Sequence, residues 1–373
     1  MNQTVYMDHN ATSPTRPKAV DAMVRAMEIG GNPSSVHSVG RKALRALEDA
    51  REQVRVAVKA PKSAQVVFTS CGTEANSLAL RGCGRDKMFA AATEHAAVLR
   101  ARDDIQRIPV DVNGLIDPFQ LEEMLAGGGD DTIISVMMAN NETGVLQQIE
   151  GIARIAHRYD ALVHTDAVQA LGKVYVDFAA LGVDMMSLSA HKIGGPLGVG
   201  ALIATKDVKL TAHNAGGGQE SGLRGGTQNV PGIAGFGVAA ELAVAELADM
   251  ARVKVLRDGL EARILEIAPD ATVIAVMADR LPNTSFISMP GVDAETQVMA
   301  FDLAGICVSA GSACASGKTK ASAVLGAMGM APDTAKSAVR VSFGLTNTED
   351  DIESFISAWT ELYQRKGAAR SAA

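Results

Sequence analysis

A strand-like run is followed closely by a lysine in the sequence Met185-Met186-Ser187-Leu188-Ser189-Ala190-His191-Lys192-Ile193-Gly194-Gly195-Pro196. The apolar run is typical of a buried strand, and the Gly-Gly-Pro that follows prevents a helix. Lys192 is therefore expected at the end of a strand, where a partly desolvated amine can condense with a carbonyl group. A surface lysine on a turn is the alternative, and the neighbouring stretches argue against it.

Around this strand, short apolar runs alternate with longer amphipathic ones between about residues 40 and 245. Such alternation is typical of crossover units and a mostly parallel sheet. The predicted strands are Gln65–Thr69, Thr132–Met138, Leu162–Thr165, Asp184–Ser189 and Ala201–Ala204. The predicted helices between them are Arg41–Lys59, Thr73–Arg81 and Glu150–Tyr159. We therefore predict an α/β fold.

The pattern of apolar and polar residues changes after a glycine-rich span at residues 216–226 and a long predicted helix from Ile233 to about Ile267. The elements that follow predict a smaller α+β domain: Asn283–Met289, Ala294–Ala304, Ile306–Ser309 and a closing helix Glu349–Gln364. We expect a large domain at residues 13–254, and a small domain made of residues 1–12 and 255–373.

Composition excludes several classes of protein. The chain has 373 residues, 47% of them hydrophobic, and a net charge of -7, which suits a large core. No basic block predicts a nucleic-acid partner, and no apolar run approaches the roughly 18 residues of a membrane helix. The N-terminus has no signal-peptide pattern. Four cysteines without zinc-like spacing favour a cytoplasmic protein with free thiols.

A second motif, Val66–Asn76, predicts a phosphate site. A strand runs into Ser70-Cys71-Gly72-Thr73, and a helix follows. Gly72 permits close backbone approach, Thr73 adds a hydroxyl, and the helix N-terminus offers free N–H groups. The alternative is an ordinary helix start that Thr73 caps.

Acidic and imidazole side chains follow two other predicted strands. Asp166 and Gln169 stand just beyond the strand that ends at Thr165, where α/β sheets place ligand-binding groups. An acid there can keep a pyridine nitrogen protonated, although Asp166 could instead cap a helix. His95 can stack on an aromatic ring or shuttle protons, or can simply be hydrogen-bonded in place. His164, on the opposite side of its strand, is interpreted as structural.

Small residues and two glycines surround Cys314 in the stretch Ser309–Lys318, which predicts an exposed loop. Because cysteines usually prefer burial, an exposed thiol beside Ser and Lys is a candidate nucleophile. A passive loop cysteine is the alternative. Together with Lys192, the phosphate motif, Asp166 and His95, the sequence describes a pyridoxal phosphate site with a separate thiol.

At this point the chain resembles the cysteine desulfurases of the NifS/IscS-like group (group I), in the class V aminotransferase superfamily. The order and spacing of the matching motifs make the resemblance specific. These motifs are Met7–Thr12, Gly31–His37, Ala139–Gly144, Thr165–Gln169, Ser189–Lys192, Gly216–Glu220, Gly226–Asn229, Ser309–Gly317 and Arg340–Gly344.

The resemblance implies a fold-type I transferase, with helices flanking a mostly parallel seven-stranded-type sheet in the large domain. It implies Lys192, Cys314 and His95 as catalytic residues, and Asn141 and Arg340 as substrate-binding residues. The implied ligands of pyridoxal 5'-phosphate are Gly72, Thr73, His95, Asn141, Asp166, Gln169, Ser189, Ala190, His191, Lys192 and, from the second subunit of a homodimer, Thr227.

The implied reaction removes sulfur from L-cysteine and leaves L-alanine and a persulfide on Cys314. The sulfur then passes to an acceptor protein such as an iron–sulfur scaffold, or into other sulfur-containing cofactors. Cys314 is also implied as a transient ligand of an iron–sulfur cluster, which makes it the one metal-binding candidate. The alternative is a selenocysteine lyase or another pyridoxal-phosphate-dependent β-eliminase, which depends less on the loop cysteine.

Overall fold

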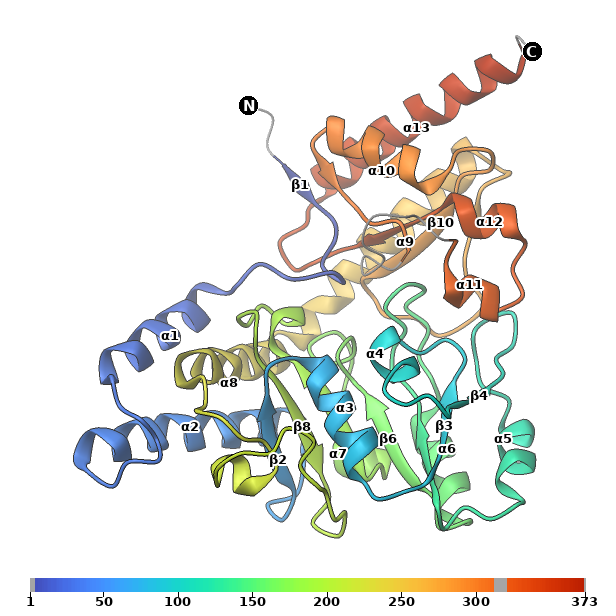
Figure 1. Cartoon of the computed structure of the whole chain (residues 1–373). Helices are drawn as coiled ribbons and strands as arrows, with labels where there is room; N and C mark the ends of the chain where they lie inside the picture. Colours follow the sequence, from blue (N-terminus) through green and yellow to red (C-terminus); the bar gives the residue numbers. More distant parts are fainter. Residues whose placement is uncertain (1–3, 312–320, 372–373) are drawn as a thin grey trace.

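A central seven-stranded sheet organises the larger part of the molecule, seen in a computed structural model that describes residues 4–311 and 321–371 (Figure 1). Its strand order is β2-β8-β7-β6-β5-β3-β4. β8 runs antiparallel to both neighbours and the other pairs are parallel. The predicted α/β fold with a mostly parallel sheet is confirmed. The strands are β2 (Gln65–Thr69), β3 (Lys87–Ala91), β4 (Gln106–Ile108), β5 (Thr132–Ser135), β6 (Leu162–Asp166), β7 (Met185–Ser189) and β8 (Gly200–Ala204).

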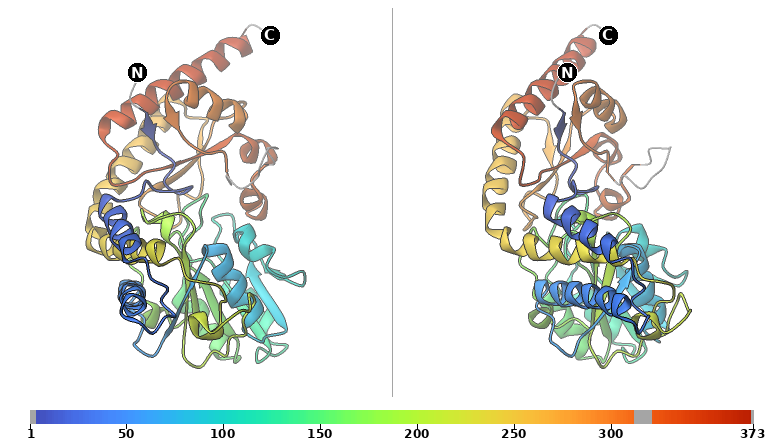
Figure 2. Two further views of the ribbon diagram at one scale, coloured as in Figure 1. Left: turned by 60° about the vertical axis from the view of Figure 1, so that its left-hand side comes forward. Right: turned by 90° about the vertical axis from the view of Figure 1, so that its left-hand side faces the viewer.

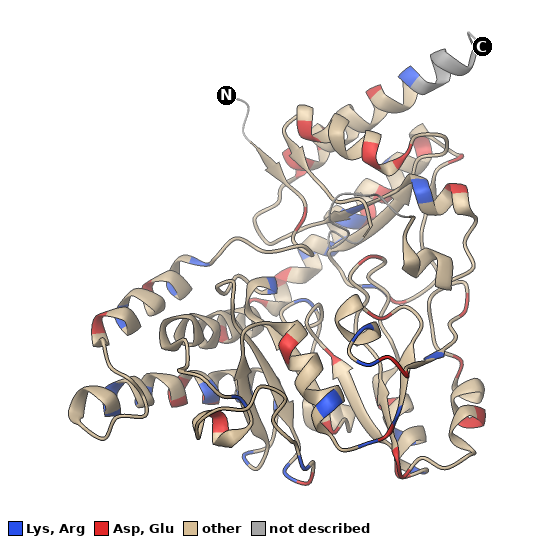
Figure 3. Cartoon of the chain, viewed as in Figure 1, with Lys and Arg blue, Asp and Glu red and all other residues tan. Residues whose placement is uncertain are grey.

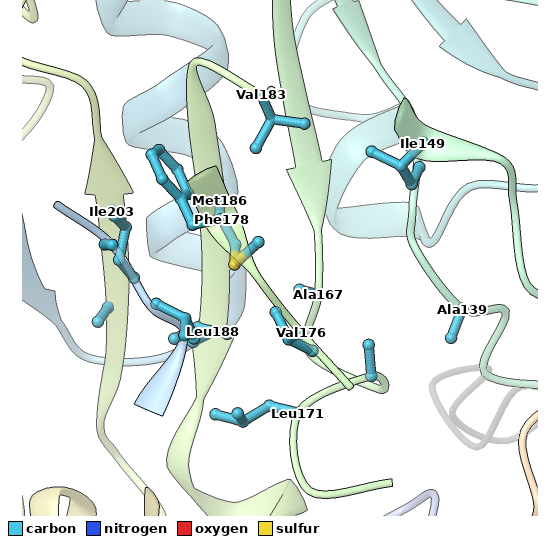
Figure 4. Packing of buried hydrophobic residues seen from close by; sticks show 14 of the residues in the cluster. Ala139, Ile149, Ala167, Leu171, Val176, Phe178, Val183, Met186, Leu188 and Ile203 are labelled. Carbon is cyan, nitrogen blue, oxygen red and sulfur yellow. The ribbon is translucent and has the colours of Figure 1, made fainter. Parts of the chain in front are cut away.

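Helices cover both faces of this sheet, and its strands β5, β7 and β8 are buried at every position. In β7, Met186 and Leu188 pack with Ile203 in one apolar core, seen in Figure 4, whereas Met185 belongs to the core on the other face. The helices of this part are α1 (Pro17–Ile29), α2 (Ser38–Ala57), α3 (Gly72–Gly82), α4 (Ala96–Leu99), α5 (Pro118–Leu125), α6 (Ile149–His157), α7 (Phe178–Leu181) and α8 (Val230–Ala245). α1 and α2 both pack on α8, which Figure 2 shows from the side.

A separate apolar core holds the smaller part together. It joins Met7 near the N-terminus to Leu260, Phe343 and Trp359. The N-terminal strand lies parallel to β11, so the first described residues pack with the last third of the chain (Figure 1). The elements are β1 (Val5–Tyr6), α9 (Met250–Ile267), β9 (Thr272–Val273), β10 (Thr284–Ser288), α10 (Ala294–Leu303), β11 (Ile306–Cys307), α11 (Ala323–Ala327), α12 (Pro332–Ser337), β12 (Ala338–Ser342) and α13 (Glu349–Ser371). The domain boundaries at residues 12 and 254 stay a prediction.

The predicted long helix from Ile233 to about Ile267 is wrong. It is two helices, α8 and α9, joined at the short turn Leu247–Asp249 and bent by 55°. No glycine or proline lies at the bend. α8 packs in the first core and α9 in the second, so tertiary packing produces the bend. Within the described residues, no single helix is long and apolar enough to span a membrane. Only this bent pair, taken together, has that length and composition.

Charged side chains of both signs are interspersed along the helices, as Figure 3 shows. On α2, for example, Arg51 pairs with Glu48 and Arg55 with Glu52, one helical turn apart. Such exposed pairs contribute only about 0.3–0.5 kcal/mol each. We therefore attribute the stability of the fold to its apolar cores.

Candidate active site

The strand ends that the sequence singled out meet at one cavity of about 240 Å³ between the two parts of the molecule. The cavity lies where ligands bind in open α/β sheets, beyond the carboxyl ends of β6 and β7. The predicted site residues that line it are Gly72, Thr73, His95, Asn141, Asp166, Gln169, Ser189, His191, Lys192 and Arg340.

Three predicted residues are not among the lining side chains. Ala190 is fully buried between Ser189 and His191. Thr227 is exposed and is not among the residues that line the cavity of its own chain. Cys314, predicted as both nucleophile and metal ligand, lies outside the described residues. Within residues 4–311 and 321–371, no three His, Cys, Asp or Glu side chains group together as a metal site.

Lys192 follows β7 in a short 3₁₀ turn, and its amine points back to the N-terminal segment. Nζ donates to the carbonyl oxygens of Asn10, at 2.6 Å, and Ala11, at 2.7 Å. That segment is anchored because the Asn10 backbone N–H donates to Ser342 Oγ at 2.9 Å. Sequence reasoning gave Asn10 and Ala11 no role, because backbone acceptors leave no residue-type signal.

The carboxylate of Asp166 is held at both oxygens. Asn76 Nδ2 donates to Oδ2 at 2.7 Å, and the Val168 backbone N–H donates to Oδ1 at 3.0 Å. Asp166 ends β6 and a turn follows, so the alternative role as a helix cap is wrong. Asn76 was missed, although its position four residues after Gly72 puts both on one face of α3.

The N-terminus of α3 also lines the cavity. The helix starts at Gly72, and the side chain of its N-cap, Cys71, makes no capping hydrogen bond, so the alternative of a Thr73 cap is wrong. A Cβ on Gly72 would lie 2.9 Å from Val168 Cγ2. Ser189 Oγ is buried and has no hydrogen-bond partner among the described residues. Free helix N–H groups beside an unpaired hydroxyl fit a phosphate group.

His95 is held as a neutral ring. Its Nδ1 accepts the Ala97 backbone N–H at 3.1 Å, so the proton of the neutral imidazole is on Nε2. Burial lowers the pKa of His95. The charge of Asp166 opposes this effect more weakly, and the charge of Lys192 lowers the pKa further. Burial also lowers the pKa of His191 to about 4. Neutral imidazoles next to a cavity can stack on a ring or exchange one proton.

Arg340, in β12, presents a guanidinium that is only partly satisfied. One amino group donates to Asp8 Oδ1 at 2.7 Å and the other to the Asn141 carbonyl oxygen at 3.0 Å. Nε is buried and has no partner among the described residues. A carboxylate in the cavity can therefore still bind this side chain. Asp8 was missed, because a single acid near the N-terminus has no distinctive spacing.

A buried lysine, Lys173, supports this cavity. Lys173 donates to Asn10 Oδ1 at 2.9 Å and to Gln169 Oε1, and Gln169 Nε2 donates to the Asn10 carbonyl oxygen at 2.9 Å. Burial lowers the pKa of Lys173 well below its usual value, and the neighbouring Lys192 and Arg340 act in the same direction. Lys173 thus fixes the amide of Gln169. Its spacing of four residues from Gln169 was the available signal, which we missed.

His164 is structural, as predicted. It is fully buried between Ser135 Oγ and Ser187 Oγ, each 2.9 Å from a ring nitrogen. Burial lowers its pKa to about 3.

We expect His164→Gln to lower stability at pH 7 but to make stability less sensitive to acid. Because folding depresses the pKa of His164, only the unfolded chain binds a proton at this ring as the pH falls below about 6.5. The unmodified chain therefore loses about 2 kcal/mol of unfolding free energy at His164 between pH 7 and pH 5, and the glutamine variant does not. Urea denaturation at both pH values measures the difference. The exposed His213→Gln variant is the control; equal pH sensitivity of His164→Gln and the unmodified chain would contradict the expectation.

Comparisons with known proteins identify the family of the chain. Residues 5–355 match the family model of class V aminotransferases. A cysteine desulfurase of Cereibacter sphaeroides is 43% identical over 94% of this chain and 93% of its own. The cysteine desulfurase IscS of Dictyoglomus turgidum is 38% identical over 94% and 92%. The structure of a NifS-like protein from Rickettsia africae superposes with a TM-score of 0.91 and 38% identity, over 97% of this chain and 100% of that one.

Proposed function

This chain belongs to the class V aminotransferase family and is a pyridoxal-phosphate-dependent cysteine desulfurase, and from that premise we propose that Lys192 holds the cofactor and Cys314 takes the sulfur. The observation that carries the proposal is the cavity itself. It brings an amine, a fixed carboxylate, an unpaired buried hydroxyl at a helix N-terminus and an incompletely paired guanidinium together. When bound, the cofactor supplies a protonated ring that withdraws electrons from the substrate carbons.

The chain's own residues fit this cofactor group by group. Asp166, with both oxygens fixed, would hold the ring nitrogen in its protonated form. The N-terminal turn of α3 and Ser189 would bind the phosphate, with His191 and Thr73 beside them. His95 would stack on the ring, and Gln169, fixed by Lys173, would contact the ring hydroxyl.

The substrate would be oriented by its carboxylate. Arg340 offers its buried Nε and the remaining amino hydrogens, and Asn141 lines the cavity next to it. Lys192 would then move the proton at Cα, since Lys192 lines the same cavity. His95 is the proposed carrier of the substrate thiol proton, which its Nε2 can accept in the tautomer that has its ring proton on Nδ1 and gives up the hydrogen bond from Ala97.

Sulfur transfer would occur between two thiol groups. The thiolate of Cys314 attacks the substrate sulfur, so one S–S bond forms and the Cβ–S bond breaks. The electron pair of that bond stays on carbon, which takes a proton and becomes the methyl group of alanine. No outside oxidant is needed, because sulfur is oxidised as carbon is reduced.

We further propose a homodimer in which Thr227 completes the phosphate site of the second subunit. Thr227 is exposed and does not line its own cavity, which supports this arrangement. The sulfur acceptor is a second protein, for which an iron–sulfur scaffold is the first candidate, and Cys314 could bind an emerging cluster there. The free thiols Cys71, Cys83 and Cys307 agree with a cytoplasmic location.

A single-turnover experiment tests the proposal. Holoenzyme mixed with L-cysteine without reductant is expected to release one alanine per bound cofactor and to gain one persulfide sulfur on the peptide that contains Cys314. Amino-acid analysis and peptide mass spectrometry measure the two products. Alanine formation with the extra sulfur on another cysteine, or sulfide and pyruvate in place of alanine and persulfide, would contradict it.

A further inference from the structure

The residues on either side of segment 312–320, which contains Cys314 and lies outside the described residues, meet at one buried carboxylate. Ser322 Oγ donates to Glu142 Oε2 at 2.5 Å. A Cβ built on Gly311 would lie 3.4 Å from the same oxygen and 3.7 Å from Ser322 Cβ. Residues 311 and 322 are therefore close neighbours, and the carboxylate of Glu142 accepts a hydrogen bond from Ser322 and lies beside Gly311.

Glu142 belongs to a turn that also forms the substrate side of the cavity. Asn140 Oδ1 accepts the backbone N–H groups of Glu142, at 2.8 Å, and Thr143, at 2.9 Å, which fixes the turn. The preceding residue, Asn141, lines the cavity and accepts a hydrogen bond from Arg340 through its carbonyl oxygen. One short turn thus connects the Glu142 carboxylate to the place where the substrate carboxylate would bind.

The other flank of the segment is tied to the same arginine. Ser309 Oγ donates to Asp8 Oδ2 at 2.7 Å, while Asp8 Oδ1 accepts from Arg340. The backbone N–H of Arg340 also donates to the Ser309 carbonyl oxygen at 2.7 Å. Both flanks of the segment are therefore connected to Arg340, one through Asp8 and the other through Glu142.

Burying the carboxylate of Glu142 costs free energy. The side chain is 3% exposed, and burial raises the pKa of Glu142, with only Ser322 and Arg340 opposing. The hydroxyl of Ser322 already caps α11 by accepting the Leu325 N–H at 3.1 Å. Since capping needs no buried acid, stability alone does not account for Glu142.

We propose that Glu142 is a positioning residue for sulfur transfer: its carboxylate fixes the Ser322 flank of the segment that carries Cys314, next to the Gly311 flank, relative to Arg340 and the bound substrate. The inference rests on the proposed function, in which the thiol of Cys314 attacks the substrate sulfur. Glu142 touches neither the substrate nor the reacting atoms. Its effect is on the rate of transfer, and not on the affinity for cysteine.

The test separates these two quantities in the dimeric holoenzyme. Glu142→Ala is expected to bind L-cysteine within about twofold of normal, measured by the change in cofactor absorbance, and to form persulfide in a single turnover roughly 10- to 100-fold more slowly, because small displacements of reacting groups carry such costs. Glu142→Gln is expected to recover most of the rate, because its amide oxygen can still accept the Ser322 hydroxyl.

Glu261→Ala is the matched control, since Glu261 is also buried but pairs with Arg280 in the second core. It is expected to lower the melting temperature without slowing transfer. Ser322→Ala should slow transfer like Glu142→Ala, and the double variant should be no slower than either single one.

A normal transfer rate in Glu142→Ala, the same slow rate in Glu142→Gln, or a parallel loss of binding and transfer would overturn the inference. The proposed function fails separately, if Cys314→Ser still produces alanine from cysteine.

Discussion

Replacing Lys192 by alanine is expected to lower kcat for cysteine at least about 1,000-fold, the upper part of the range for losing a positioned acid–base group. The amine of Lys192 has two proposed tasks, to bind the cofactor covalently and to move the proton at Cα. It is placed for both by its carbonyl contacts to Asn10 and Ala11. Lys192→Arg should be nearly as inactive, since a guanidinium stays protonated and does not condense with an aldehyde.

Borohydride reduction of the holoenzyme, followed by peptide mapping, checks the covalent link directly. The cofactor mass is expected on the peptide with Lys192 and to be absent in Lys192→Ala. Lys173 is an internal control, since it is the buried amine beside Gln169 and lies next to the same cavity wall. Label on Lys173, or no label on Lys192, would refute the assignment.

Cys314→Ser is expected to separate the cofactor chemistry from sulfur transfer. The variant should keep the visible absorbance of the bound cofactor and still respond to L-cysteine, while persulfide and alanine formation fall at least about 100-fold, because a serine hydroxyl is a far weaker nucleophile than a thiolate at neutral pH. Alanine assays and peptide mass spectrometry measure both products. Cys307→Ser, which removes a half-buried thiol, is the control and should stay active.

The same variant separates the desulfurase from its alternative. A selenocysteine lyase or other β-eliminase would depend less on the loop thiol. Unchanged turnover of L-cysteine by Cys314→Ser would therefore disprove the nucleophile, and retained turnover of L-selenocysteine alone would show a second activity of the same cavity.

The sequence predicted the elements whose pattern is local. β2 is observed with its predicted bounds, and α3 and β7 within one residue of theirs. The predicted strand Thr132–Met138 ends at Ser135 as a regular strand, yet Val136 and Met138 still donate backbone hydrogen bonds to β6 residues. The bend between α8 and α9 could not be predicted, because no breaker residue marks it and two separate cores produce it.

The sequence predicted those site residues whose side-chain type indicates their chemistry. Lys192, Asp166 and Arg340 carry groups that suggest a role, and the structure brings all three to one cavity. Asn10 contacts Lys192 through its backbone oxygen, and Asn76 acts through the side chain of Asp166, so the residue type indicates neither role. Glu142 shows its position only when residues 311 and 322 are seen together.

The N-terminal segment has a consequence for synthesis on the ribosome. Asp8 and Asn10 contact Arg340 and Ser342, 332 residues further along the chain. At about 5–20 residues per second, those partners are translated roughly 17 to 66 seconds later. The seven-stranded sheet can form in the meantime, but the carbonyl groups that receive Lys192 cannot be in place. The pocket around the amine of Lys192 is therefore completed only after β12 has been synthesised.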